Sequence, residues 1–202
     1  RHMDQKRLSQ EERFRKILYQ NPLIDTVLAK ADELALANWH LCAGCLTQSV
    51  WNAVFEFPAE HGIDDIDLIY FDTDDLSDEA EENHAQQART LFPDLPVRLD
   101  VKNEARVHLW YESKFGKVIP PFQSIEHAVS NFPTTATTIA VRPRSDRLSI
   151  VAPFGLGDLF DGIVRPNKAM VTQDRYEAKI ERWRRFWPQL TYLPWQSSDE
   201  ED

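Results

Sequence analysis

Two aspartates occupy alternate positions in an apolar stretch, residues 63–71, where their spacing is suited to metal chemistry. Side chains at i and i+2 of a β-strand share a face, so Asp65 and Asp67 lie opposite Ile66 and Leu68. Their Cα atoms should lie ~6.5 Å apart. Burying an ionised carboxylate is costly unless a positive group compensates it. The pattern therefore indicates a bound cation, and Mg²⁺ prefers such oxygen ligands.

Residues 41–52 begin as an apolar strand and turn at Gly44 into a helix. The first N–H groups of a helix have no partners within the helix, and the helix dipole adds positive potential there. Helix N-termini therefore favour anions, including phosphate groups. A phosphate site beside a pair of metal-binding acids suggests chemistry on nucleotides.

Another acid lies in a separate predicted strand, residues 97–102. In this strand Val97, Leu99 and Val101 alternate with polar residues and form one face, while Asp100 lies on the other. A strand of this kind can hold a third carboxylate next to the first two.

The elements that must position these acids form an α+β fold, in which a mixed β-sheet is flanked by helices at both ends of the chain. Asn21 and Pro22 are typical of a helix start, and Tyr176, Ile180, Trp183 and Trp187 form one core-facing stripe of the last helix. Residues 103–111 fit either a strand or a helix. The other predicted helices begin at Ser9, run from Asn21 to about Asn38, and cover residues 46–55, 78–91 and 125–129; further strands cover residues 39–43, 137–141 and 148–151.

Length and composition favour one domain. The chain has 202 residues, of which 42% are hydrophobic, enough for a single core. We expect an N-terminal cloning remnant over residues 1–3, one domain over residues 4–195 with its core at about 37–112 and additions over 113–195, and an acidic tail over residues 196–202.

Charge and cysteine content restrict partners and compartment. The net charge of −10 argues against a general nucleic-acid binder, because neutralising phosphates supplies most non-specific affinity. No apolar run approaches the ~20 residues of a membrane span. Two cysteines without an extracellular disulfide pattern fit a reducing cytoplasm.

The order of these motifs resembles the DNA polymerase beta-like nucleotidyltransferase superfamily. Its pattern is a glycine turn that opens a helix, an acid-apolar-acid strand, and a third acid on a neighbouring strand. Longer stretches resemble a bacterial family of nucleotidyltransferase-like proteins more closely, from about Pro22 to Pro194. These stretches are residues 43–52, 65–72, 105–111 and 152–159.

The resemblance implies a polymerase-beta-like fold and a metal-dependent transfer. Asp65 and Asp67 would bind Mg²⁺ or Mn²⁺, and Asp100 would complete the metal site and act as general base. A nucleoside triphosphate would give its monophosphate to a hydroxyl acceptor and release pyrophosphate. The acidic balance of the chain favours a protein or a small molecule over a nucleic acid as the acceptor.

The resemblance also places the nucleotide. Gly44 and Cys45 would hold its terminal phosphates. Cys45 stands where the superfamily usually has Ser or Gly, so a hydroxyl contact is lost, and Thr47 or Ser49 are candidates to replace it.

Basic and aromatic residues after the third acid are further candidates. Arg106 could contact a phosphate or a base, and Tyr111 could stack on a base. Each also has a purely structural interpretation, as the partner of a structural acid and as a packed ring. Arg142, Arg144 and Lys168 are weaker candidates for the triphosphate.

Two other functions fit parts of the sequence. Cys42 and Cys45 form a Cys-x-x-Cys motif at a strand-to-helix junction, as in thioredoxin-like redox sites, and His40 or His61 could join them around zinc. Neither reading explains the three strand acids. The third possibility is a protein that keeps the fold and binds a nucleotide or a partner without catalysis.

Overall fold

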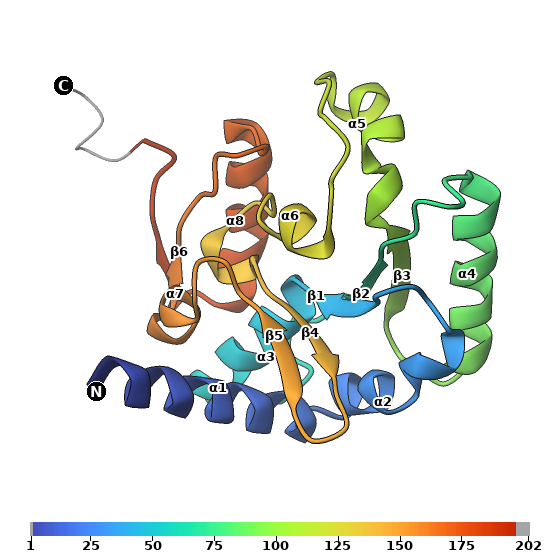
Figure 1. Cartoon of the computed structure of the whole chain (residues 1–202). Coiled ribbons are helices and arrows are strands. Elements are labelled where there is room, and N and C mark those ends of the chain that lie inside the picture. Colours follow the sequence, from blue (N-terminus) through green and yellow to red (C-terminus); the bar gives the residue numbers. More distant parts are fainter. Residues whose placement is uncertain (1, 197–202) are drawn as a thin grey trace.

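The computed structural model describes residues 2–196, with side chains from residue 9 onward. Arg1 and the acidic tail over residues 197–202 lie outside the described part. The chain forms the expected α+β fold around a mixed five-stranded sheet (Figure 1). Its strand order is β3-β2-β1-β4-β5, and only the β2–β3 pair is parallel. The strands are β1 (His40–Cys42), β2 (Asp65–Tyr70), β3 (Arg98–Asn103), β4 (Ala140–Pro143) and β5 (Leu148–Val151).

Helices surround this sheet, and a two-stranded parallel pair, β6 (Ile163–Val164) and β7 (Thr191–Tyr192), joins the C-terminal part. None of the described helices is both long and apolar enough to cross a membrane. The α-helices are α1 (His2–Gln20), α2 (Pro22–Lys30), α3 (Gly44–Val54), α4 (Asp78–Leu91), α5 (Val107–Phe115), α6 (Ile125–Val129), α7 (Gly157–Asp161) and α8 (Gln173–Phe186), and the 3₁₀ helices are η1 (Ala31–Leu34), η2 (Glu104–Arg106) and η3 (Thr135–Thr137).

Most predicted elements are present, with shifted ends at several helices. Helix α1 begins at His2 rather than Ser9, because its polar residues are good helix formers and no breaker precedes Asn21-Pro22. Asn21 caps α2 as predicted by accepting the Leu23 N–H, but α2 ends at Lys30 and not near Asn38. The ambiguous residues 103–111 form the end of β3, η2 and the start of α5.

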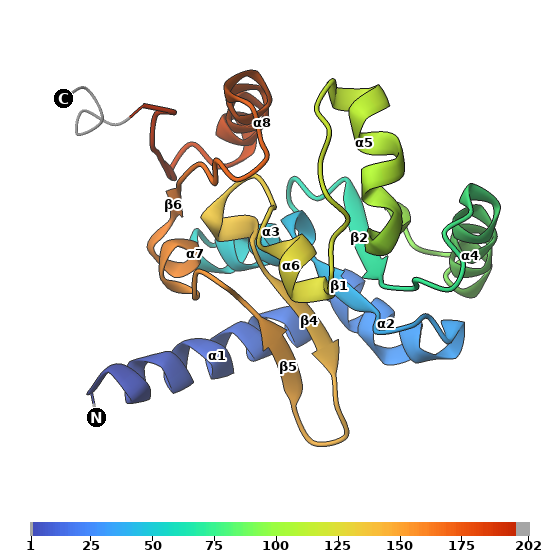
Figure 2. The ribbon, with the colours of Figure 1, turned by 45° about the horizontal axis from the view of Figure 1, so that its top comes forward.

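The two faces of the sheet differ in character. Ile66, Leu68, Leu99 and Val101 are buried in the main core together with residues of α1 to α4. The opposite face carries Asp65, Asp67 and Asp100 at its β2–β3 side, while α6 covers its centre through Cys42, Ile69 and Ala140. Figure 2 shows α5, α6 and α8 on this second side. The acids therefore lie on the face that these three helices frame.

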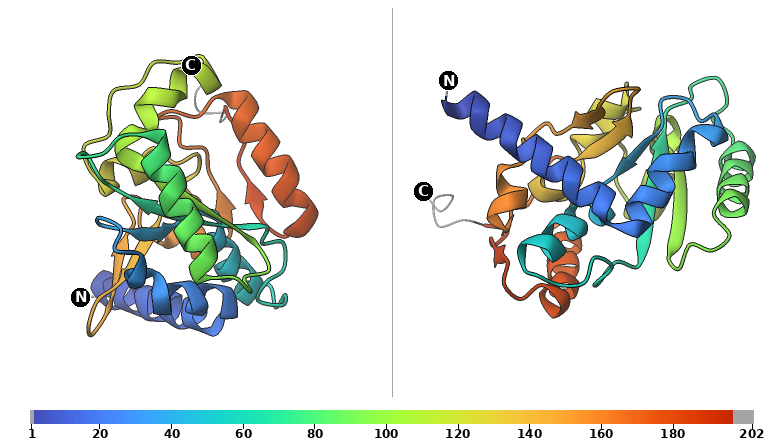
Figure 3. Two further views of the ribbon diagram at one scale, coloured as in Figure 1. Left: turned by 90° about the vertical axis from the view of Figure 1, so that its right-hand side faces the viewer. Right: turned by 90° about the horizontal axis from the view of Figure 1, so that it is seen from below.

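Helix α8 is anchored by the tryptophan stripe that the sequence predicted. Trp183 and Trp187 are buried, and both pack against Trp51 of α3 at centroid distances of 5.2 and 5.4 Å. Gly62 allows the Trp187 ring to pack closely against the loop before β2, because a Cβ at residue 62 would lie 2.6 Å from that ring. Seen from below, α1 crosses under the sheet beside α3, and α8 lies behind α3 (Figure 3). Segments far apart in sequence are thus fixed to one another around α3.

Candidate active site

Three carboxylates converge where β2 and β3 run side by side. The parallel register pairs Asp67 with Asp100 and Asp65 with Arg98. One ligand oxygen from each of Asp65, Asp67 and Asp100 lies within 4.8 Å of the other two, and all three residues are partly exposed. Alternate residues of adjacent strands face the same side of a sheet, which explains the grouping. The structure thus brings together the three acids that the sequence predicted as one site.

Arg98 shares this face and links two of the acids. Its Nη2 donates to Asp65 Oδ2 at 3.0 Å, and its Nε is 3.1 Å from both carboxylate oxygens of Asp100. The hydrogen bond to Asp100, and then the charges of Asp100 and Asp65, raise the pKa of Arg98. The sequence analysis missed this residue, although its spacing of two from Asp100 in one strand was an available signal.

Asp67 has the least compensated charge of the three acids. Among the described residues no ion pair reaches it, whereas Asp65 and Asp100 both pair with Arg98. Burial, and then the neighbouring Asp65 charge, raises the pKa of Asp67 to about 6, against the opposing effect of Lys102 and Lys179. A carboxyl group shifted in this way by burial and by like charges is typical of functional sites.

The donor set fits a hard divalent cation. All three groups offer carboxylate oxygens, the ligands that Mg²⁺ and Mn²⁺ prefer. An ion held by Asp65, Asp67 and Asp100 would supply the positive charge that Asp67 lacks, and Arg98 is partly occupying that role for the other two. These residues are therefore suited to hold Mg²⁺ or Mn²⁺.

The start of α3 lies next to the acids, as the sequence predicted. Cys42 pairs with Asp67 in the β1–β2 register, and the chain enters α3 two residues later. The sharp turn is made by Ala43, whose φ of 58° and ψ of −132° are uncommon for a residue with a side chain. Gly44 does not have a positive φ, and a Cβ there would meet the Gln48 side chain only at 3.5 Å, so neither the backbone nor the packing requires glycine. What Gly44 provides is an uncovered helix start.

The hydroxyl groups of Thr47 and Ser49 form hydrogen bonds within the protein. Both are buried; the Thr47 hydroxyl donates to Ala136 O at 2.8 Å, and the Ser49 hydroxyl donates to Cys45 O at 2.6 Å while accepting from Asn21 Nδ2. These bonds fix α3 to its neighbours. A contact of either hydroxyl with a phosphate stays a prediction, and each hydroxyl already has a partner inside the protein.

Arg106 is also held by structural partners. Its side chain is buried, its Nε donates to Leu76 O at 3.0 Å, and its Nη1 lies 3.2 Å from Glu81 Oε1. These contacts tie η2 to the start of α4. The structural interpretation of Arg106 accounts for its position, and a direct contact with the nucleotide is not supported.

The other basic candidates lie away from the acids. Arg142 stacks over the Trp39 ring at 5.6 Å, near the opposite end of β1 from Cys42. Arg144 is exposed in the loop between β4 and β5, and Lys168 lies over the Trp195 ring at 5.1 Å. These positions do not support contacts with a triphosphate at the acids.

A row of bases on α8 faces the acidic end of the sheet instead. Arg175, Lys179 and Arg182 are spaced by four and three residues, which puts them on one side of the helix. Arg182 pairs with Asp64. Burial lowers the pKa of Lys179, and Asp67 is the strongest charge acting against that shift. The helical spacing of these three bases beside the tryptophan stripe was a signal in the sequence that they face the sheet.

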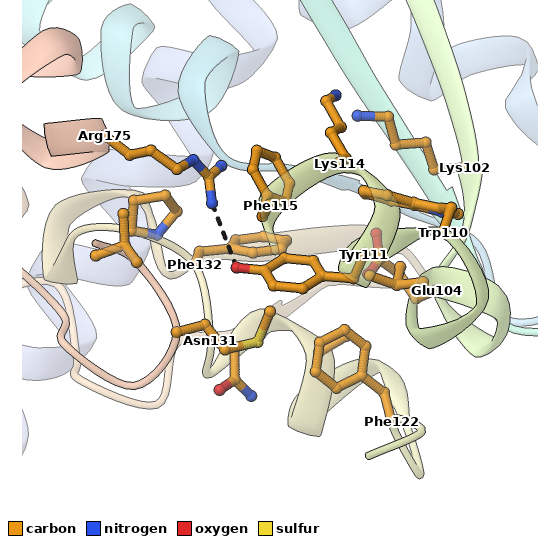
Figure 4. A pocket seen from close by; sticks show the side chains of 15 residues that line it. Lys102, Glu104, Trp110, Tyr111, Lys114, Phe115, Phe122, Asn131, Phe132 and Arg175 are labelled. Carbon is orange, nitrogen blue, oxygen red and sulfur yellow. Dashed lines mark hydrogen bonds between the residues drawn. The ribbon is translucent and has the colours of Figure 1, made fainter. Parts of the chain in front are cut away.

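A cavity of about 200 Å³ opens where β3 ends, beyond Asp100 along the strand (Figure 4). Its walls come from α5, the segment after α6, and the start of α8. Tyr111, Phe115 and Phe122 supply aromatic walls, while Lys102 and Glu104 line the cavity where β3 ends. Arg175 donates to the Tyr111 hydroxyl at 3.4 Å. Tyr111 therefore lies in a cavity wall, where both predicted roles, packing and stacking, remain compatible with its position.

The Cys-x-x-Cys motif lacks the properties of a redox site. Cys42 and Cys45 are each 1% exposed. Burial raises the pKa of both thiols, with the Asp67 charge as the next cause. Redox-active cysteines require a lowered thiol pKa and access to solvent. Among the described residues, the acids form the only cluster suited to a metal, and neither cysteine belongs to it.

Comparisons with known proteins agree with this geometry. The family described as Nucleotidyltransferase matches residues 29–192, most of the chain. A solved NMR structure described as revealing a CCA-adding enzyme head domain superposes with a TM-score of 0.73 at 23% identity, covering 92% of this chain and 94% of that one. No curated protein matches the sequence. At 23% identity, the likeness to the solved structure shows the fold alone, and the match to the family model shows family membership. The chain belongs to the nucleotidyltransferase family and has its polymerase-beta-like fold.

Proposed function

We propose that this protein is a metal-dependent nucleotidyltransferase that transfers a nucleoside monophosphate from a nucleoside triphosphate to a hydroxyl acceptor. The observation that carries the proposal is the convergence of Asp65, Asp67 and Asp100 within 4.8 Å beside the start of α3. Family membership supports the same chemistry.

Each part of the site has a distinct role in this proposal. Asp65, Asp67 and Asp100 hold Mg²⁺ or Mn²⁺. The bound cation would screen the negative charge of the phosphates at the α-phosphorus. The backbone N–H groups of Gly44 and Cys45 bind the terminal phosphates, where the helix dipole favours anions.

The proton of the acceptor also needs a destination. The acceptor oxygen forms a bond to the α-phosphorus, the bond to the β-phosphate bridging oxygen breaks, and pyrophosphate leaves. Asp100 takes the hydroxyl proton, while Lys179 and Lys102 add positive charge near Asp67. The acceptor is a protein side chain or a small hydroxylated molecule, which the acidic charge of the chain favours over a nucleic acid.

Binding and turnover test the proposal separately. Calorimetric titration with each nucleoside triphosphate should require Mg²⁺ or Mn²⁺ and should weaken sharply in the Asp65→Asn, Asp67→Asn double variant. Asp64→Asn is the matched control, because Asp64 is in the same segment but pairs with Arg182. Equal binding by the double variant and the control would defeat the metal assignment.

Turnover distinguishes an enzyme from a binding protein. Pyrophosphate release and labelling of an acceptor are measured in cell extract supplied with labelled nucleotide. Asp100→Asn should keep nucleotide binding but lower the rate ~10²–10⁴-fold, the usual contribution of general-base catalysis.

The second candidate function is nucleotide binding without catalysis, which the position of Arg98 between two of the acids favours. Metal-dependent binding without pyrophosphate release would establish that alternative.

A further inference from the structure

Glu104 is a buried residue whose carboxylate reaches a cavity and has no hydrogen-bond partner among the described residues. Its residue is 6% exposed and lines the cavity between α5, α6 and α8. Its carboxylate accepts no hydrogen bond from the described residues, although Asn103 and Arg106 beside it bond to neighbours through their side chains. Buried polar groups in proteins are almost always paired, since an unpaired one costs free energy. A ligand in the cavity that donates a hydrogen bond would supply the missing partner.

Glu104 lies at the end of the cavity nearest the three acids. It follows Asp100 and Lys102 along the chain, at the point where β3 ends and η2 begins. The charges of Lys102 and Asp67 both act on its carboxylate. It is nevertheless outside the group of ligand atoms that Asp65, Asp67 and Asp100 form. Its position is therefore suited to a group adjoining the phosphates rather than to the metal itself.

Aromatic rings line the cavity next to its polar end. Figure 4 shows Lys102 and Glu104 on one side together with the Trp110 ring, and the rings of Tyr111 and Phe115 across the middle of the cavity. A nucleotide also carries a flat base next to polar groups, with phosphates at one end, a sugar with hydroxyl donors next, and the base last. Phosphates at the acids place the sugar near Glu104 and the base among the rings, where bases stack favourably.

We propose that Glu104 binds a ribose hydroxyl of the nucleotide and that the site therefore selects ribonucleoside over deoxyribonucleoside triphosphates. This inference rests on the proposed nucleotide function. A carboxylate accepts hydrogen bonds and cannot donate them when ionised, so a sugar without the hydroxyl leaves it unpaired. Sites built to bond a substrate hydroxyl reject analogues that lack it far more strongly than apolar pockets reject extra groups.

Affinities for matched nucleotides test the proposal. Each ribonucleoside triphosphate is compared with its 2′-deoxy and 3′-deoxy forms by calorimetry in the presence of Mn²⁺, using the whole protein. We expect at least one deoxy form to bind about 10- to 100-fold more weakly, the usual worth of a hydrogen bond to a charged group. The identity of the weak form shows which hydroxyl contacts Glu104.

Two variants assign the preference to this side chain. Glu104→Ala should bind ribo and deoxy forms with nearly equal affinity, and Glu104→Gln, which keeps an acceptor oxygen, should retain part of the preference. The control Glu112→Ala alters an exposed acid on α5 and should keep the full preference. At pH 8 and without ligand, Glu104→Gln should also melt at a higher temperature than the wild type, since it removes a charge from a buried residue. A purely structural role for Glu104 predicts lower melting temperatures and equal losses for both sugars.

The possible failures are distinguishable. Absence of binding by every nucleoside triphosphate would overturn the proposed function and this inference together. Metal-dependent binding with equal affinity for ribo and deoxy forms would overturn only the role of Glu104. An unchanged preference in Glu104→Ala would do the same.

Discussion

Helix α8 takes part in two regions of opposite character. One side of it packs Trp183 and Trp187 against Trp51, and the Trp187 indole N–H donates to Asn52 Oδ1 at 2.8 Å. The Asn52 amide donates in turn to the carbonyls of Ala59 and His61. Within the described residues Trp51 Nε1 is the one fully buried indole nitrogen of this cluster without a hydrogen-bond partner. In this tryptophan cluster the buried apolar rings pack together, and the buried polar atoms of Trp187 and Asn52 have hydrogen-bond partners.

The other side of α8 faces the acid site, where carboxyl groups are shielded from solvent without enough positive or hydrogen-bonding partners. Asp67 is partly exposed and Glu104 is buried, and both carboxyl groups lie among like charges; desolvation raises the pKa of Asp67 to about 6 and that of Glu104 to about 7. Three acids lie within reach of one cation, with Arg98 bonded to two of them. The comparison indicates that the tryptophan cluster stabilises the fold. The acid site lowers that stability, because its carboxylates lack the positive or hydrogen-bonding partners that a ligand would provide. Changes in the two regions should therefore alter stability in opposite directions.

The largest effect is expected in the tryptophan cluster. Trp187→Ala should lower the free energy of unfolding by about 3–5 kcal/mol, because it opens a core cavity and leaves Asn52 Oδ1 unpaired. Chemical denaturation measures the change. Trp195→Ala is the control, since Trp195 is only partly buried and should cost much less. Similar losses for the two variants would contradict the assignment of stability to this cluster.

A smaller effect of opposite sign is expected at Asp67. Its pKa in the folded protein, about 6, is above the ordinary value of 3.8, so between those pH values the folded state binds more protons than the unfolded state. The contribution of Asp67 to stability therefore falls as pH rises from about 4 to 6 and then stays constant. Without metal, Asp67→Asn should be more stable than the wild type at pH 8 by on the order of 2 kcal/mol.

Denaturation at several pH values in the presence of a chelator gives the difference between the two proteins. That difference should grow from pH 4 to pH 6 and then level off. Added Mn²⁺ should stabilise the wild type and leave Asp67→Asn nearly unchanged, since binding to the folded state raises its stability. A variant less stable than the wild type at pH 8 without metal would show that Asp67 has a structural role.

The smallest effect is expected at Arg98. Its side chain is 68% exposed, so its pairs with Asp65 and Asp100 are worth at most about 1 kcal/mol. Arg98→Gln should bind Mn²⁺ roughly three- to fivefold more tightly, because the ion no longer competes with the guanidinium. Calorimetry with Mn²⁺ checks this, with Arg182→Gln as the control for losing a neighbouring positive charge. Weaker Mn²⁺ binding by Arg98→Gln would show that Arg98 supports the site rather than competing for it.

The sequence was informative where local chemistry decides the structure. The alternation around Asp65 and Asp67 predicted their shared face, and the cap at Asn21 predicted the start of α2. Strands β4 and β5 also lie close to the predicted strands at residues 137–141 and 148–151. These features depend on neighbours in the chain, which a sequence displays directly.

Contacts between distant segments were not predictable in this way. Neither the approach of Lys179 to the acids nor the cavity around Glu104 follows from local patterns, since both depend on how α8 and α5 pack over the sheet. Thr47, Ser49 and Arg106 look equally suited to ligands and to internal bonds until their partners are known. Their partners Ala136, Asn21 and Leu76 are remote in sequence, and for that reason the sequence alone did not reveal these bonds.

The remote position of α8 in the chain also has a consequence for how the protein is made. The bond from Trp187 to Asn52 joins residues 135 positions apart. A chain emerging from the ribosome at ~5–20 residues per second exposes α3 and the acids several seconds before α8 can cover Trp51. Contacts of such long range form late, because closing large loops is entropically costly. The nascent protein therefore carries its three carboxylates before it has the helix that gives them positive neighbours, and the candidate site is complete only when α8 has packed.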